Sequence, residues 1–252
     1  MKKIITSILL LSVATFGFSS GGELSLDHAD IDLSDKESLQ RGARNYMNYC
    51  YGCHSLDSVR YNRIAKDLGI SEEDMGEFLI FDESKFGSLM ENAIVDSDAK
   101  KWFGATPPDL TMINRIKGTP DWVYTYLKGF YQDDSRPWGV NNTVFPDVGM
   151  PHVLYELQGL CGHPPVGDSH VRYDSLSEYQ THEGGCEEYV SKGSLSPEEF
   201  DEFVLDLTNF IAYTGEPWKL KSHAIGKWVL FYLFILLLFS VAYYRELWKD
   251  VH

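Results

Sequence analysis

The stretch Cys50-Tyr51-Gly52-Cys53-His54 decides how the rest of this 252-residue chain is interpreted. Two thiols separated by two residues and followed by a histidine form the pattern on which a haem is attached. The thiols bond to its two vinyl groups, and the imidazole binds the iron. A redox-active cysteine pair is the main alternative, but such a pair usually follows a β-strand, and no strand pattern precedes Cys50. A zinc site would need a second pair of ligands, and the only other cysteines, Cys161 and Cys186, are isolated. The motif therefore predicts one covalently bound haem c.

A strongly patterned helix leads into this motif. Ser34-Asp35-Lys36-Glu37 is typical of a capping box at a helix start. Five residues then fall on one face at helical spacing: Leu39, Ala43, Tyr46, Met47 and Cys50. The predicted helix delivers Cys50 at its end, and Gly42 within it leaves room for another element to approach closely.

Further helices are predicted in the body of the chain. The clearest begins at Ser196-Pro197-Glu198-Glu199, which combines an N-cap, a proline at the first helical position and a capping-box glutamate. Its pattern ends at Gly215 and Pro217. Thr119-Pro120-Asp121 begins another helix, and a short one is expected from Ser71 to Ile80. No stretch alternates for long enough to indicate a sheet, so the fold class is mainly α with long loops.

Both ends of the chain carry an apolar segment. Residues 1–20 have two lysines, an apolar stretch and then small residues, which is typical of a secretory signal peptide. From Trp228 to Tyr244 no residue is charged, and this run at about 1.5 Å per residue reaches about 25 Å, near the lower limit for crossing a bilayer core. Residues 223–244 are therefore predicted to be a single transmembrane anchor.

The signal peptide also predicts the orientation of the chain. Lysines and arginines on the two sides of the anchor do not differ enough to decide it. Export by the signal peptide followed by a late stop places residues 21–222 in the periplasm as the haem domain. Residues 245–252 then form a cytoplasmic tail, and the chain is a single-pass protein of the bacterial inner membrane.

Two cysteines remain outside the haem motif. Cys161 and Cys186 lie in residues 159–193, a segment rich in glycine, histidine and acidic residues that is expected to be a loop. In an oxidising compartment they most simply pair with each other, so a disulfide is predicted. A regulatory redox pair is the alternative.

The sixth ligand of the iron is less directly specified. A sulfur ligand opposite the histidine raises the potential and leaves no open site, which suits electron transfer. Met150 is favoured because the loop Val148-Gly149-Met150-Pro151 can hold it rigidly. Met112 is a further candidate for lining the pocket, Met47 is assigned to helix packing, Met75 to an acidic exposed stretch and Met90 to weakly patterned sequence. His152 is the nearest rival ligand.

Composition and charge limit the class of partner. The net charge of −15 argues against nucleic acid and favours a basic partner, although acidity also keeps a protein soluble. Acidic clusters that are candidates for steering such a partner are Glu72-Glu73-Asp74, Asp133-Asp134 and Glu187-Glu188.

The chain resembles the cytochrome c1 family in its bacterial form. Members of this family are the haem subunit of the quinol–cytochrome c oxidoreductase, or cytochrome bc1 complex. The resemblance covers roughly residues 34–157 and 196–248. It is carried by these stretches: Arg41-Gly42-Ala43, the haem motif with Ser55, Arg60-Tyr61, Gly104 to Leu110, Tyr124 to Phe130 and Phe145 to Pro151, with the carboxyl-terminal anchor. The segment 159–193 departs from the shorter family members.

The resemblance implies a cytochrome c-like haem domain and a set of site residues. They are Cys50 and Cys53 as thioether sites, His54 and Met150 as axial ligands, Pro107 and Pro108 packed beside the haem, and a basic residue near a propionate. Arg115 is chosen over Lys117 for that role, because its planar fork pairs well with carboxylates.

The resemblance also implies the activity and the partners. The Rieske iron–sulfur protein gives one electron to this chain, which gives it to a cytochrome c, in a dimeric complex that includes cytochrome b. No bond is made or broken on the chain, so it is not itself an enzyme. The alternatives are a stand-alone membrane-anchored cytochrome c that donates to a terminal oxidase, and a haem peroxidase, which needs an open iron site.

Overall fold

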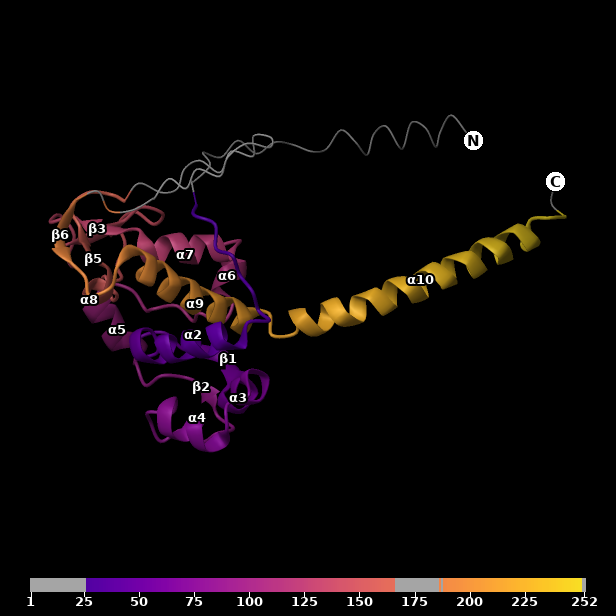
Figure 1. Cartoon of the computed structure of the whole chain (residues 1–252), viewed down its shortest axis with the longest axis horizontal. Coiled ribbons are helices and arrows are strands. Elements are labelled where there is room, and N and C mark those ends of the chain that lie inside the picture. Colours follow the sequence, from indigo (N-terminus) through magenta and orange to yellow (C-terminus); the bar gives the residue numbers. More distant parts are fainter. Residues whose placement is uncertain (1–25, 166–185, 187, 251–252) are drawn as a thin grey trace, which may run out of the picture.

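The computed structural model describes residues 26–165, 186 and 188–250 (Figure 1). The predicted signal peptide lies outside these residues. The helices are α2 (Lys36–Tyr49), α3 (Tyr61–Leu68), α4 (Glu72–Phe78), α5 (Asp96–Phe103), α6 (Ile113–Ile116), α7 (Pro120–Lys128), α8 (Tyr155–Gln158), α9 (Pro197–Gly215) and α10 (Lys219–Leu247). The strands are β1 (Leu56–Arg60), β2 (Leu89–Met90), β3 (Phe130–Gln132), β4 (Val140–Asn142), β5 (Gly159–Cys161) and β6 (Tyr189–Lys192). The predicted mainly α fold class with one apolar carboxyl-terminal helix is confirmed.

The core of the body is built on the packing of α2 against α9, which lie side by side (Figure 1). The apolar face predicted for α2 is buried, and the Tyr46 ring contacts that of Phe210 with centroids 5.7 Å apart. Helix α9 is more deeply buried, with Val204 and Leu207 fully covered. The first and last helices of the body therefore enclose one hydrophobic core, and the haem motif follows directly from one of them.

Gly42 allows this close approach. A Cβ atom placed there would collide with the carbonyl oxygen of Asp206 and would lie 2.7 Å from the Cβ of Phe210. The expected role of Gly42 as a point of close approach is confirmed, and its partner is α9.

The start of α9 follows its predicted pattern, whereas the start of α2 does not. At α9 the Ser196 hydroxyl accepts from the Glu199 amide, and the Glu199 carboxylate accepts from the Ser196 amide, which is a complete capping box. At α2 the cap is Asp35, whose carboxylate accepts from the amides of Glu37 and Ser38. The prediction of a capping box from Ser34 was wrong, because the Ser34 hydroxyl donates to Asp32 instead.

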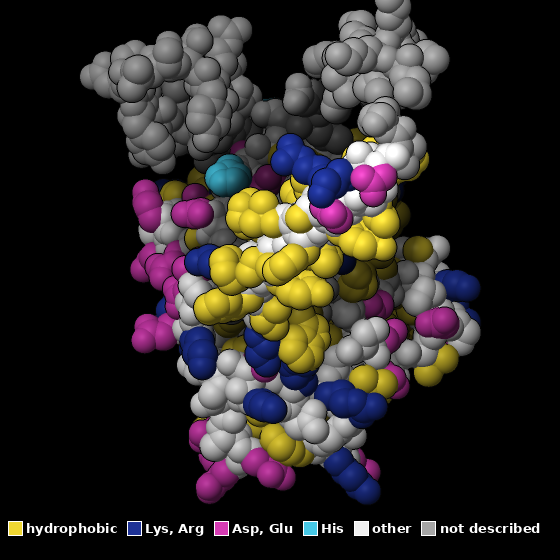
Figure 2. Space-filling model, turned by 90° about the vertical axis from the view of Figure 1, so that its right-hand side faces the viewer, with side chains coloured by type: hydrophobic (Ala, Val, Ile, Leu, Met, Phe, Trp, Pro, Cys, Tyr) yellow, Lys and Arg dark blue, Asp and Glu magenta, His cyan; other side chains and the backbone are white. Residues whose placement is uncertain are grey.

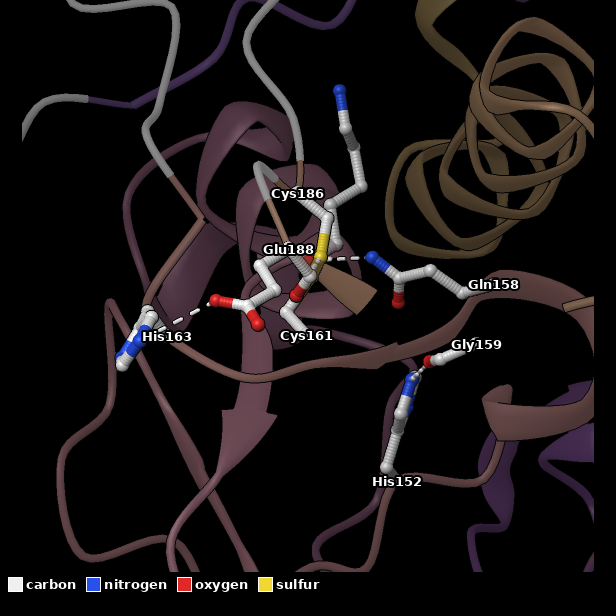
Figure 3. Close-up of a disulfide and its surroundings, with 8 residues drawn as sticks. His152, Gln158, Gly159, Cys161, His163, Cys186 and Glu188 are labelled. Atoms are coloured by element: carbon white, nitrogen blue, oxygen red, sulfur yellow. Dashed lines mark hydrogen bonds and ion pairs between the residues drawn. A yellow bond between two sulfur atoms is a disulfide. The ribbon is translucent and has the colours of Figure 1, made fainter. Parts of the chain in front are cut away.

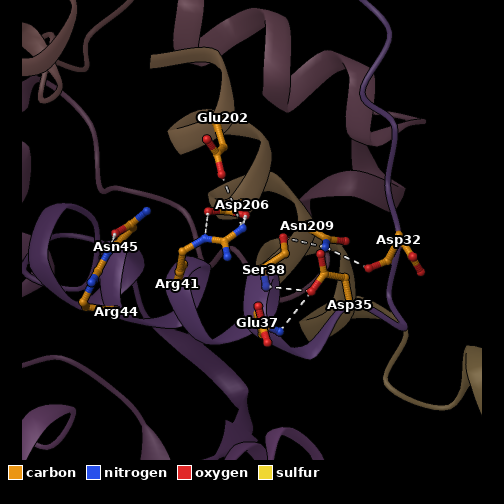
Figure 4. A network of polar contacts seen from close by, with 10 residues as sticks. All are labelled: Asp32, Asp35, Glu37, Ser38, Arg41, Arg44, Asn45, Glu202, Asp206 and Asn209. Atoms are coloured by element: carbon orange, nitrogen blue, oxygen red, sulfur yellow. Dashed lines mark hydrogen bonds and ion pairs between the residues drawn. The ribbon is translucent and has the colours of Figure 1, made fainter. Parts of the chain in front are cut away.

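Polar contacts fasten the two helices together (Figure 4). The Arg41 guanidinium donates to both carboxylate oxygens of Asp206, from Nε at 2.6 Å and from the terminal nitrogen at 2.9 Å. The Asn209 amide donates to the Ser38 hydroxyl and to the Asp32 carbonyl. These contacts join α2, the chain before it and α9 into one unit.

Two small sheets contradict the expectation that the body contains none. β1 pairs with β2, and the four-stranded sheet has the order β4-β3-β5-β6. β3 and β4 are antiparallel, whereas β3 and β5 are parallel. Each strand has two to five residues, which is too short for an alternating pattern to stand out from the sequence. The described ends of the segment 159–193, expected to be a loop, form β5 and β6.

Helix α10 projects away from the body (Figure 1). It has 29 residues and is therefore about 43 Å long at about 1.5 Å per residue. Ile225–Leu247 has a mean hydropathy of 2.2, and none of its apolar window is covered by the described chain. Figure 2 shows hydrophobic side chains gathered on the side from which this helix projects. The helix begins before residue 223 and ends after residue 244, whereas its apolar span, Ile225–Leu247, begins two residues after the predicted start and ends three residues after the predicted end.

Candidate haem site

The two cysteines and the histidine of the motif are held in one turn at the end of α2. The Cys50 carbonyl accepts from the amide of Cys53 at 3.0 Å and from that of His54 at 2.9 Å. The buried Tyr46 hydroxyl donates to the His54 carbonyl oxygen at 2.6 Å. The backbone of the motif is therefore fixed from the helix before it.

The imidazole of His54 is oriented by the Pro-Pro-Asp segment. Its Nδ1 lies 2.7 Å from the carbonyl oxygen of Pro108, and because a carbonyl only accepts, Nδ1 carries the hydrogen. Burial lowers the pKa of His54, so the ring is neutral at pH 7. The lone pair of Nε2 is then free to bind a metal, and the Nδ1 contact fixes the ring in the way usual for histidine ligands.

Asp109 fastens this segment to the motif. Its carboxylate accepts from the Asp57 amide at 2.7 Å and from the Thr111 amide at 3.0 Å. The Leu110 amide donates to the Ser55 carbonyl. Pro108 is thus held at a fixed position relative to His54.

The motif opens into an apolar cavity of about 430 Å³. Cys50, Cys53, His54 and Met150 all line it. Its wall is mostly apolar or aromatic: Phe103, Pro107, Pro108, Leu110, Trp122, Val123, Tyr126, Leu127, Phe145, Val148, Pro151, Val153 and Ile211. No carboxylate is among the described residues that line it. The size lies within the range of known cofactor pockets.

Met150 reaches this cavity on a loop that two asparagines organise. The Asn142 amide nitrogen donates to the Tyr126 carbonyl at 2.7 Å, and its oxygen accepts from the Val144 amide at 3.1 Å. The Asn141 side chain accepts from the Asp147 amide at 2.9 Å. These two asparagines were not predicted from the sequence, although they lie in a loop rich in Asn, Gly and Pro, where such side chains often bond to the backbone.

Arg136 holds the same loop from the solvent side. Its guanidinium donates to the Asp147 carboxylate at 2.9 Å and to the Asp147 carbonyl at 2.7 Å. Asp147 has a φ of 61°, a left-handed conformation that is uncommon outside glycine. These contacts support the bend that precedes Val148 and Met150.

Among the described residues, Met150 is the methionine that lines the cavity. Met47 and Met90 are buried elsewhere, and Met75, which was predicted to be exposed, is also buried. Met112 is 38% exposed and does not line the cavity, so the expectation that it lines the pocket was wrong.

His152 does not face the cavity either. Its Nε2 lies 3.2 Å from the Gly159 carbonyl (Figure 3), and its ring stacks on Phe130 with centroids 4.8 Å apart. Burial lowers its pKa to about 4. The sulfur of Met150 is therefore the better candidate for the sixth ligand.

The cavity wall contains Lys117 and not Arg115. The side chain of Arg115 is 63% exposed, and its guanidinium lies 3.6 Å from the Glu216 carboxylate. The ammonium of Lys117 lies 4.5 Å from the ring centroid of Trp122 and 4.8 Å from that of Phe145, both of which line the cavity. Lys117 is therefore the basic residue at the cavity wall, whereas Arg115 lies against Glu216.

The residues present fit a haem c. Two thiols, an available imidazole nitrogen and a thioether line one apolar cavity, as a covalently bound macrocycle requires. The buried hydroxyl of Thr106, which also lines it, has no hydrogen-bond partner within the described chain. Burial raises the pKa of Cys50 to about 12, whereas a redox-active pair needs a low pKa. No strand directly precedes the motif, since α2 does.

Cys161 and Cys186 are joined as a disulfide at the base of the segment between β5 and β6 (Figure 3), with Cα atoms 5.5 Å apart. Most of the chain between them lies outside the described residues. We expect the intact protein to take up alkylating reagent at these two positions only after reduction, which mass spectrometry measures. Alkylation at both without reduction would contradict the pairing.

Comparisons with known proteins find a family model and relatives that match over most or all of the chain. The model of the Cytochrome C1 family matches residues 29–173. Cytochrome c1 of Allochromatium vinosum is 49% identical, with all of both chains covered. A protein of Nitrosomonas europaea named ammonia monooxygenase gamma subunit is 41% identical, again over all of both chains. Cytochrome c1 of Rhodospirillum rubrum is 21% identical, with 99% of this chain and 97% of the relative covered.

Proposed function

Because this chain belongs to the cytochrome c1 family, carries one covalently bound haem c and is a haem electron-transfer subunit of the cytochrome bc1 complex, we propose that it accepts one electron from the Rieske iron–sulfur protein and passes it to a cytochrome c. The observation that carries the proposal is that Cys50, Cys53, His54 and Met150 line the same apolar cavity. One electron enters and one leaves, so the chain makes and breaks no bond in turnover.

Each of these four residues has a distinct task. Cys50 and Cys53 would hold a haem through thioether bonds, and His54, whose Nδ1 is held by the Pro108 carbonyl, would bind its iron through Nε2. Met150 would supply the second protein ligand of the iron, which would leave no site for an exogenous ligand. The haem, when bound, supplies reversible one-electron redox chemistry. Pro107, Pro108 and the aromatic wall keep water away from the site.

The chain is membrane-anchored through α10, and we place its haem domain on the periplasmic side of the inner membrane. The signal peptide of residues 1–20 supports export, and the apolar span after it supports a stop in transfer. Residues 21–222 then form the periplasmic domain and residues 245–252 the cytoplasmic tail.

The proposed partners are cytochrome b and the Rieske protein within a dimeric complex, with cytochrome c as the acceptor. The acidic net charge of −15 supports a basic acceptor. The alternative is a stand-alone membrane-anchored cytochrome c that donates to a terminal oxidase. It shares the haem and the anchor but needs no quinol-oxidising partner.

Purification from membranes separates these two functions. We expect the detergent-extracted chain to give a pyridine haemochrome spectrum of one haem c and to co-purify with cytochrome b and an iron–sulfur protein. Electron transfer from a quinol to cytochrome c should weaken as salt rises, because opposite charges steer the encounter. Co-purification with an oxidase and without cytochrome b would support the alternative.

Lys117 is proposed in place of Arg115 as the cation beside a haem propionate. Loss of a positive charge near a redox centre disfavours its reduced state, so Lys117→Gln should lower the potential by about 40 mV, equivalent to about 1 kcal/mol. Arg115→Gln is the matched control, because Arg115 lies against Glu216 outside the cavity. Redox titration measures the reduction potentials of both variants. A larger fall for Arg115→Gln than for Lys117→Gln would favour Arg115 as the cation beside the propionate.

A further inference from the structure

The hydroxyl of Tyr126 lies 3.3 Å from the sulfur of Met150, and both residues line the cavity. A phenol O–H donates and a thioether sulfur accepts, so the hydrogen bond runs from Tyr126 to Met150. A thioether sulfur has two lone pairs. One can therefore accept this hydrogen bond while the other stays available for an iron.

Contacts that do not involve Met150 fix the position of Tyr126. Its ring stacks on Trp122 with centroids 5.0 Å apart and an interplanar angle of 12°. The rings of Tyr126 and Phe130 pack edge to face, with their centroids 5.4 Å apart. The carbonyl oxygen of Tyr126 accepts from the Asn142 side chain at 2.7 Å, which ties α7 to the loop that carries Met150. The hydroxyl is thus a preset donor and does not depend on the sulfur for its place.

The hydroxyl of Tyr126 is partly buried. Within the described chain the Met150 sulfur is its hydrogen-bond partner. If this hydroxyl lost the sulfur as its partner, water could not fully replace the hydrogen bond, and the loss would cost free energy.

We propose that Tyr126 is a positioning residue for Met150, and that its hydroxyl raises the reduction potential of the site by withdrawing electron density from the sulfur. This rests on the proposed ligation by Met150. A sulfur that shares a lone pair with a donor gives less electron density to the iron, which favours the reduced state. Second-shell hydrogen bonds tune metal ligands in this way in general.

Tyr126→Phe in the intact complex tests the proposal, because phenylalanine keeps the ring and its stacking and removes only the hydroxyl. We expect the equilibrium constant for reduction to fall about three- to tenfold, the range that one hydrogen bond spans. For a one-electron couple this equals about 30 to 60 mV at 59 mV per tenfold. The long-wavelength absorption band that marks sulfur–iron ligation should persist.

Tyr124→Phe is the matched control. Tyr124 lies on the same helix, but its hydroxyl is 3.4 Å from the Lys128 ammonium and it does not line the cavity. The reduction potential of the Tyr124→Phe variant should equal that of the parent chain. A parent chain with the sulfur–iron band and a Tyr126→Phe variant of unchanged potential would overturn this inference alone. A parent chain without the band would instead refute ligation by Met150.

Discussion

Replacing Met150 with leucine is expected to lower the reduction potential by on the order of 0.2 V, because axial ligands set haem potentials over a range of about 0.8 V. Leucine has a similar volume, so the loop held by Asn141, Asn142 and Arg136 should keep its shape. The sulfur–iron band should disappear, and the reduced protein should bind carbon monoxide at the vacated position. Redox titration and absorption spectra of the purified complex measure these changes.

Met47→Leu is the control for this experiment. Met47 is also a buried methionine, on α2, but it does not line the cavity. Its substitution should leave the potential and the band unchanged. If Met150→Leu kept both, a different side chain would have to be the sixth ligand, and the proposed role of Met150 would fail.

Replacing Gly42 with alanine is expected to destabilise the haem domain by about 3 kcal/mol, at the upper end of typical overpacking costs. The added Cβ would meet the backbone carbonyl of Asp206, which cannot rotate away as a long side chain does. Helices α2 and α9 would have to separate, and α2 ends in the haem motif. For a chain of this size the thermal midpoint, followed by circular dichroism of the haem band, should fall by about 6 to 12 °C.

Gly76→Ala provides the comparison. Gly76 is also inside a helix, α4, and a Cβ there would meet nothing within 4 Å. Alanine is the better helix former, so the midpoint should stay the same or rise slightly. Equal midpoints for Gly42→Ala and the parent chain would mean that α2 and α9 are free to move apart.

The sequence predicted the helices well where their signals are local. Ser196, Pro197 and Glu199 determine the start of α9 through contacts within one turn. The strands could not be predicted in the same way. Tyr131 pairs with Cys161, 30 positions later, and such a pairing depends on where the intervening chain folds.

In the candidate site, too, features with local sequence signals were predicted and features that depend on distant residues were not. Cys50, Cys53 and His54 are contiguous, and their types and spacing were enough to predict haem attachment. The local sequence could not show whether Lys117 or Arg115 lines the cavity, because Arg115 lies against Glu216, about a hundred residues away. The burial of Met75 was not predicted either, because its acidic neighbours in the sequence indicated an exposed stretch.

By itself, then, the sequence determined the haem motif at Cys50 to His54, the helices that enclose the core and the apolar carboxyl-terminal span. All of these depend on residues within a few turns of one another. Only the tertiary structure decided which sulfur and which cation line the cavity, and that Tyr126 donates to Met150. Those contacts join α7 to a loop that follows β4, and their geometry is set by packing and long-range hydrogen bonds such as that of Asn142.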